Sequence, residues 1–156
     1  MMTEPKKVVR EAFSLLGKEG STADGADFIA ALWRDANAHF SEIAPLVKMT
    51  GEEEGIRVWG AMTDQSRSFL PWDEEYSRGL YLAGVECRED AVAPAGWVRW
   101  DVPGFEYLCV PSGDGEEFSE MLTYLADRNI PLEGAVQEFY APEDGGCWLY
   151  FPIRRL

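Results

Sequence analysis

Hydrophobic residues recur along this chain with two different periods. Alternation in short runs rich in Val, Phe, Trp and Tyr predicts β-strands, whereas apolar residues three or four positions apart predict helices. Alternating runs end at turns rich in Gly, Pro and Asp. The strands predicted in this way are Lys7–Leu16, Ile56–Thr63, Tyr76–Cys87, Trp97–Val102, Phe105–Val110, Val136–Tyr140 and Trp148–Pro152.

Two longer segments have helical spacing instead. The first begins at the capping residues Ser21–Asp24 and is expected to end near Pro45, since proline cannot continue a helix. The second follows Asp114, a second capping residue, and ends before Pro131. Each segment has an apolar stripe that requires a partner surface.

The order of these elements is strand, helix, strand, strand, and then the same again with an extra strand beforehand. This order predicts an α+β fold with an internal duplication. We expect one domain over residues 1–156, with a first repeat at about 7–87 and a second at about 96–154. Antiparallel sheets would lie in front of two long helices, with a ligand cleft between the halves.

A carboxylate lies in the middle of the strand at 136–140. Alternation places Val136, Glu138 and Tyr140 on one face of that strand, and Gln137 and Phe139 on the other. If the first face is buried, the carboxylate is paired, protonated or part of a ligand site. An antiparallel sheet can also leave one face in water, where a glutamate needs no partner. The 20 aromatic residues favour the ligand site, because such residues build apolar pockets.

The chain is strongly acidic, with 28 acidic and 14 basic residues and a formal net charge of −14. This charge repels phosphate backbones, so we expect no direct contact with nucleic acid. It also concentrates cations near the surface, besides its general effect on solubility.

Cysteine and histidine usage argues against a metal centre. Cys87, Cys109 and Cys147 share no short spacing, and His39 is the single histidine. We expect no metal, no cofactor and no Ser-His-Asp or Cys-His catalysis. Scattered cysteines suit a reducing compartment. Because the first ten residues are charged and no apolar run has the length of a membrane span, we expect a cytoplasmic protein that does not enter membranes.

Several short segments together resemble one family, the GyrI-like small-molecule-binding domains, also called the AraC-type or bacterial transcription-activator effector-binding domain. The matching segments are Leu32-Trp33, Val58-Trp59-Gly60, Leu80–Glu86, Glu138-Phe139-Tyr140 and Trp148–Ile153. The resemblance covers roughly residues 7–154 and implies tandem βαββ units related by a pseudo-two-fold axis, with a ligand cleft at their junction. It also implies a free-standing effector domain, since 156 residues leave no room for a DNA-binding module.

In drug-sensing relatives, a glutamate in an aromatic wall meets lipophilic cations, and the motif places that role on Glu138. Aromatic faces attract cations, and a buried carboxylate supplies the counter-charge. We therefore expect the chain to bind hydrophobic, cationic or polyaromatic small molecules such as drugs or toxins.

Aromatic side chains are expected to complete the ligand site, although each could instead belong to the core. We expect Trp33 to line the cleft only if the cleft reaches the first helix. Trp72 with Phe69 is expected to form a lid over the cleft, the alternative being a hydrophobic plug on the surface. The full set expected around Glu138 is Tyr140, Trp148, Tyr81, Trp59, Tyr107, Trp33, Trp72 and Phe69.

Two other functions stay open from the sequence. Some free-standing relatives resemble hydrolases of cyclopropane-bearing electrophilic natural products; here Glu138 would be the general acid and base. Tyr107 or Tyr140 would then donate a hydrogen bond to the oxygen that gains charge. Alternatively, the acidic surface could engage a basic protein partner, such as gyrase or a transcription factor.

Overall fold

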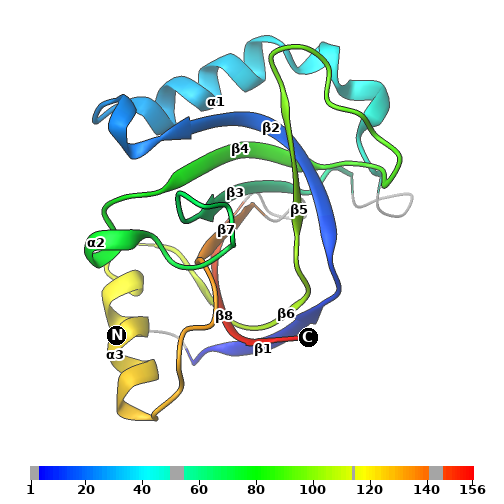
Figure 1. Ribbon diagram of the computed structural model, residues 1–156. Helices are drawn as coiled ribbons and strands as arrows, with labels where there is room; N and C mark the ends of the chain where they lie inside the picture. The colour runs from blue at the N-terminus through cyan, green and yellow to red at the C-terminus, as the bar shows by residue number, and fades with distance from the viewer. Residues whose placement is uncertain (1–3, 50–54, 114, 141–145) are drawn as a thin grey trace.

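The computed structural model describes residues 4–49, 55–113, 115–140 and 146–156, and within them eight strands form one curled antiparallel sheet (Figure 1). The strands are β1 (Lys6–Arg10), β2 (Phe13–Ser21), β3 (Val58–Thr63), β4 (Leu80–Glu86), β5 (Val98–Val102), β6 (Phe105–Pro111), β7 (Gln137–Tyr140) and β8 (Cys147–Arg155). Their order across the sheet is β1-β6-β8-β7-β3-β4-β2-β5. The predicted α+β class with antiparallel strands is confirmed.

The strand order is symmetric about the centre of the sheet. One half reads β1-β6-β8-β7 from its edge inwards, and the other reads β5-β2-β4-β3. Helix α1 (Phe28–Ala38) follows β2, and helix α3 (Glu117–Asp127) follows β6, so each half contains a βαββ unit. Each unit also has a strand before it, and these two strands are exchanged. Strand β1 pairs with β6 of the second half, and β5 pairs with β2 of the first half.

Both helices cover the outer face of the curl, each over its own half (Figure 1). The apolar stripe of α1 packs on Leu16, Tyr81, Ala83 and Val85 from β2 and β4. The stripe of α3 packs on residues of β6 and β8, with Met121 and Leu125 fully or almost fully buried. The central strands β3 and β7 therefore lie between the two helices.

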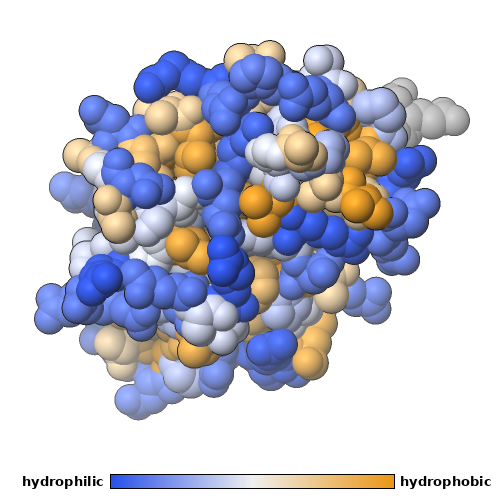
Figure 2. Space-filling model, turned by 45° about the horizontal axis from the view of Figure 1, so that its top comes forward, coloured by the Kyte–Doolittle hydropathy of each residue, from blue (hydrophilic) through white to orange (hydrophobic). Residues whose placement is uncertain are grey.

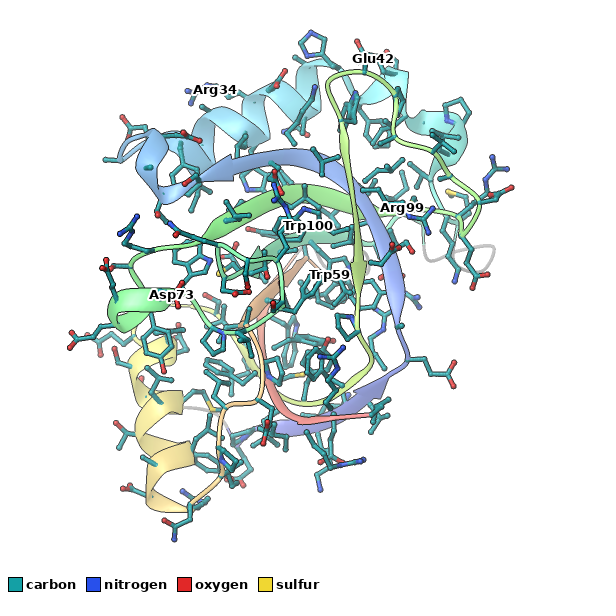
Figure 3. All side chains as sticks on the ribbon, viewed as in Figure 1. Arg34, Glu42, Trp59, Asp73, Arg99 and Trp100 are labelled. Carbon is teal, nitrogen blue, oxygen red and sulfur yellow. The ribbon has the colours of Figure 1, made fainter. Side chains whose placement is uncertain are left out.

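The inner face of the curl holds a second core. Alternation turns Trp59 inwards from β3, and Trp100 reaches the same interior from β5 (Figure 3). Most of the surface shown in Figure 2 is hydrophilic, and apolar residues appear between the polar ones in separate patches. None of the described helices is long and apolar enough to cross a membrane.

The strand predicted at Lys7–Leu16 is interrupted at Glu11-Ala12: β1 and β2 follow one another in the same direction and keep one antiparallel register, in which Arg10 pairs with Phe105 and Phe13 with Val102. Strand β2 also continues beyond the predicted end at Leu16, through Gly17 and Gly20 to Ser21. The interruption lets the chain bend with the curl, so that β1 pairs with β6 while β2 pairs with β5. Local alternation carries no information about these distant pairings.

The first helix is shorter than predicted, because α1 ends at Ala38 and is followed by 3-10 turns at Phe40–Glu42 and Ala44–Leu46. The predicted capping box forms between Ser21 and Asp24, but it caps a separate 3-10 turn that Gly25 ends. Asp114, predicted to cap the second helix, lies outside the described residues.

The strand predicted from Tyr76 begins at Leu80. The segment Asp73–Tyr76 instead forms a single turn, α2, in which Glu74 and Glu75 have left-handed backbone angles. Their φ values of 51° and 59° are incompatible with a strand.

Candidate functional site

The gap between the two helices is hollowed on the outer face of the sheet. The Phe118 hollow, of about 200 Å³, is lined by Met62, Pro71, Trp72, Tyr76, Phe118, Ala135 and Val136. The Asn37 hollow, of about 340 Å³, is lined by Trp33, Asn37, Val58 and Tyr140. A third hollow, of about 250 Å³, extends beneath Trp33 towards Leu16 and Trp97.

Glu138 lies between the Phe118 hollow and the Asn37 hollow. Strand β7 pairs it with Gly60 at the centre of β3. Val136 lies two residues before Glu138 and lines the Phe118 hollow, and Tyr140 lies two residues after it and lines the Asn37 hollow. Because side chains alternate, all three point to the outer face.

Glu138 leans across β3 towards β4. Its Oε1 accepts a hydrogen bond of 2.7 Å from the Tyr81 hydroxyl, which in turn accepts one of 3.0 Å from Trp33 Nε1. A Cβ atom on Gly60 would overlap both the Tyr81 hydroxyl and Glu138 Oε1. The absence of a side chain at Gly60 thus allows both groups to meet above β3.

Aromatic rings surround this hydrogen-bonded chain. The Trp33 ring contacts Tyr81 and Tyr140 edge to face, with ring centroids 6.4 and 5.5 Å apart. Edge contacts of this kind fix the rings relative to one another. Helix α1 therefore supplies one wall of the cleft and the central strands supply its floor.

Burial raises the pKa of the Glu138 carboxyl, and the hydrogen bond from Tyr81 opposes that shift only in part. Burial also raises the pKa of Tyr81 and of Tyr140, and the nearby Glu138 charge adds to both shifts. Both hydroxyls are therefore protonated donors at neutral pH. Among the described residues, Tyr81 is the one hydrogen-bond partner of the Glu138 side chain, and no Lys, Arg or His forms an ion pair with it.

Solved structures match nearly the whole chain, whereas no family model and no curated protein matches its sequence. An integron cassette protein from Vibrio cholerae is 13% identical, with 98% of this chain and 97% of that chain covered and a TM-score of 0.59. SAV2435, solved with tetraphenylphosphonium bound, is also 13% identical, with coverages of 97% and 94% and a TM-score of 0.63. The chain has a GyrI-like fold.

EcmrR, solved in a complex with DNA, contains the same fold within a longer chain. The match is 12% identical, with a TM-score of 0.67, and it covers 98% of this chain but 58% of EcmrR. At such identities the likeness concerns the fold.

The GyrI-like sheet brings together four of the residues expected at the site: Glu138, Tyr81, Tyr140 and Trp33. Trp33 was expected to line the cleft only if the cleft reaches the first helix, and Trp33 and Asn37 of α1 do line the Asn37 hollow. Trp72 lines the Phe118 hollow, where its ring is held by a hydrogen bond of 3.0 Å from Nε1 to the Leu80 carbonyl.

The other expected residues do not meet Glu138. Strand register pairs Phe139 with both Trp59 and Trp148, so these side chains share the inner face with Phe139 rather than the outer face with Glu138. Tyr107 is fully buried on that inner face, and Phe69 packs against Trp100. Trp72 without Phe69 therefore borders the hollows.

Several lining residues were not expected from the sequence, namely Met62, Val136, Phe118, Tyr76, Asn37 and Val58. Their placement depends on how α1 and α3 pack on the sheet. Gly60 did carry a signal, because a glycine inside a strand often marks close approach of another group.

A second buried carboxylate, Glu86, was also missed. It lies inside the curl and accepts hydrogen bonds from Arg10 Nη1 (2.9 Å), Arg10 Nη2 (3.0 Å) and Trp59 Nε1 (2.8 Å). These contacts satisfy its charge, so Glu86 is structural. In the part of the chain that the structure describes, no group of three or more His, Cys, Asp or Glu side chains is arranged to hold a metal ion.

Proposed function

We propose that this chain binds hydrophobic cations in the cleft between α1 and α3, with Glu138 as the counter-charge. The observation that carries the proposal is the half-buried Glu138 carboxylate, which has one neutral hydrogen-bond partner and no cationic partner among the described residues. Burying a charge without an opposite charge is costly, and a bound cation removes that cost.

The surroundings of Glu138 favour an organic cation over a metal ion. The rings of Trp33 and Tyr140 offer aromatic faces and edges beside the carboxylate, and aromatic faces attract cations by about 0.5–2 kcal/mol each. The hollows on both sides are largely apolar and suit carbon substituents rather than water ligands.

Two further facts support this ligand class. SAV2435, which has the same fold, was solved with tetraphenylphosphonium, a hydrophobic cation. The formal net charge of −14 raises the local concentration of cations around the molecule.

Isothermal titration calorimetry with tetraphenylphosphonium tests the proposal. We expect Glu138→Gln to weaken binding about 10- to 100-fold, because a hydrogen-bonded or paired charge contributes about 1.5–3 kcal/mol. Gln keeps the shape and the acceptor for Tyr81, so the change isolates the charge.

The matched control is Glu11→Gln, which removes the same charge from an exposed position between β1 and β2. It should leave the affinity within about twofold, since exposed charges at a distance are screened by salt. Equal affinities of wild type and Glu138→Gln would contradict the proposal.

The raised pKa of Glu138 also favours a second candidate function, hydrolysis of strained-ring electrophiles, because a general acid must hold its proton near neutral pH. Tyr140 and Tyr81 lie beside Glu138 and could donate to the developing oxygen charge, whereas Tyr107 lies on the inner face. Turnover of substrate at catalytic protein concentration distinguishes hydrolysis from binding alone. A gyrase or transcription-factor partner stays a prediction.

A further inference from the structure

We infer that the cleft selects cations with one central positive charge and an apolar arm on each side, a narrower class than hydrophobic cations in general. This inference rests on the proposed function, because it takes Glu138 as the point that fixes the charge. It is carried by the position of Glu138 between two separate hollows of different character.

The spacing of the two hollows follows from strand geometry. Along β3, Met62 and Val58 lie two residues to either side of Gly60, the pairing partner of Glu138. Met62 lines the Phe118 hollow and Val58 lines the Asn37 hollow. Two residues of an extended strand span about 7 Å, so each arm should place its ring about 7 Å from the charge.

The Phe118 hollow suits a single aromatic ring. Its lining is apolar apart from the Tyr76 hydroxyl and the indole of Trp72, whose N–H already donates to Leu80. Tyr76 and Phe118 close one side by an edge contact of 5.4 Å between centroids. An apolar cavity of about 150 Å³ holds benzene, and this hollow has about 200 Å³.

The Asn37 hollow is larger and offers polar groups. It has about 340 Å³ and is bordered by the exposed Asn37 amide as well as by Trp33 and Tyr140. The second arm can therefore be bulkier than the first and can end in a hydrogen-bonding group. The cleft is asymmetric even though the sheet around it is symmetric.

A cation with one arm would fill one hollow and leave the other hydrated. A cation with two arms buries a second ring at no further cost in translational freedom. The comparison is therefore between trimethyl(phenylpropyl)ammonium and dimethyl-bis(phenylpropyl)ammonium, which carry the same charge and the same kind of arm. Bis(phenylpropyl) sulfoxide is the neutral counterpart with two arms.

We expect the two-armed cation to bind wild type at least about tenfold more tightly than the one-armed cation in calorimetric titration, given the apolar area of one additional buried ring. The neutral sulfoxide should bind more weakly than the two-armed cation. Glu138→Gln should reduce the affinity for both cations and should not reduce the affinity for the sulfoxide.

Two variants test whether the two arms of the cation occupy these two hollows. Met62→Trp fills the Phe118 hollow from the sheet, and Asn37→Trp fills the Asn37 hollow from the exposed side of α1. Each should lower the affinity for the two-armed cation to that of the one-armed cation. Each variant should still bind the one-armed cation measurably, because one hollow is available, and the variant that fills the hollow preferred by the single arm should lose more affinity. That retained binding also shows that the variant is folded.

The outcomes separate the two claims. If both cations bind wild type equally well and Glu138→Gln weakens both, the two-armed shape is wrong and the proposed function stands. If the two-armed cation is preferred but neither tryptophan variant removes the preference, the assignment to these hollows is overturned. If neither cation binds, or if Glu138→Gln binds the cations as tightly as wild type, the proposed function fails and this inference fails with it.

Discussion

Glu86 and Glu138 are both carboxylates on strands of the same sheet, but their surroundings differ. Glu86 is fully buried and accepts three hydrogen bonds, two of them from the guanidinium of Arg10. Glu138 accepts one hydrogen bond from a neutral hydroxyl among the described residues. The fold thus supplies an opposite charge to Glu86 but only a neutral hydrogen-bond donor to Glu138. A buried carboxylate without an opposite charge is suited to a ligand site.

The pH dependence of stability should reveal this difference at Glu138. Burial raises its pKa in the folded state, so folding favours the protonated carboxyl. Below the ordinary carboxyl pKa both states are protonated and no penalty exists. As the pH rises through the folded-state pKa, the fold must carry the buried charge and loses stability.

We therefore expect Glu138→Gln without ligand to melt at a higher temperature than wild type at neutral pH. The difference should shrink to nothing on acidification to about pH 4, near the ordinary glutamate pKa. Thermal melts of both proteins and of the exposed control Glu11→Gln across this range provide the measurement. A lower melting temperature for Glu138→Gln at neutral pH would mean that the carboxylate stabilises the fold.

At the scale of elements, backbone strain is concentrated in segment 67–76, which contributes Trp72 and Tyr76 to the lining of the Phe118 hollow. The described chain has six non-glycine residues with positive φ, and five of them lie in this segment: Arg67, Phe69, Glu74, Glu75 and Tyr76. The left-handed region costs an L-residue about 1–2 kcal/mol, because Cβ approaches the next carbonyl oxygen. Backbone strain of this kind tends to occur where a segment positions a ligand site.

Glu75→Gly should therefore stabilise the protein. Glycine adopts the φ of 59° without a Cβ clash, and we expect a gain of up to about 1 kcal/mol after glycine's larger loss of entropy. Urea unfolding measures the change. The control is Ala31→Gly on the exposed side of α1, which should destabilise by about 1 kcal/mol. Losses of similar size in both variants would show that the α2 turn is not strained.

The local hydrophobic pattern predicted most helices and strands, and it placed Glu138 and Tyr140 on the same face of their strand. It could not predict which faces of different strands lie on the same side of the sheet. Trp59 was expected beside Glu138 and lies on the opposite face. The next residue, Gly60, is the one whose outer face lies beneath the Tyr81 hydroxyl and the Glu138 carboxylate. Alternation divides each strand into two faces, whereas the register between β3 and β7 decides which residues become neighbours. That register depends on contacts between residues about 80 positions apart, so no local window contains it.

On the scale of the whole molecule, one buried ion pair joins distant parts of the sheet. Arg10 is on β1 at the sheet edge, and Glu86 is on β4 in the other half. The Arg10 guanidinium also lies over the ring of Phe13, 4.5 Å from its centroid. The pair therefore holds the two halves together inside the curl.

Arg10→Met should destabilise the protein by up to about 3–5 kcal/mol, because the buried Glu86 charge keeps Arg57, 3.7 Å away, as a cationic partner but loses the closer Arg10. The double variant Arg10→Met/Glu86→Leu should recover part of that loss, since no unpaired charge remains. Arg34→Met on the exposed face of α1 is the control and should change stability little (Figure 3). Chemical denaturation of all four proteins gives the comparison. A double variant less stable than Arg10→Met would contradict this account.

The exchange of β1 and β5 makes the chain equivalent to a strand-swapped dimer whose protomers are covalently joined. Neither βαββ unit is complete alone, because the strand that covers its edge is supplied by the other unit. Separation of the units would break the β1–β6, β5–β2 and β3–β7 pairings together, so the molecule should melt in one cooperative step. A cation bound at the β3–β7 seam would then act as a clamp, and its binding energy would stabilise both units together.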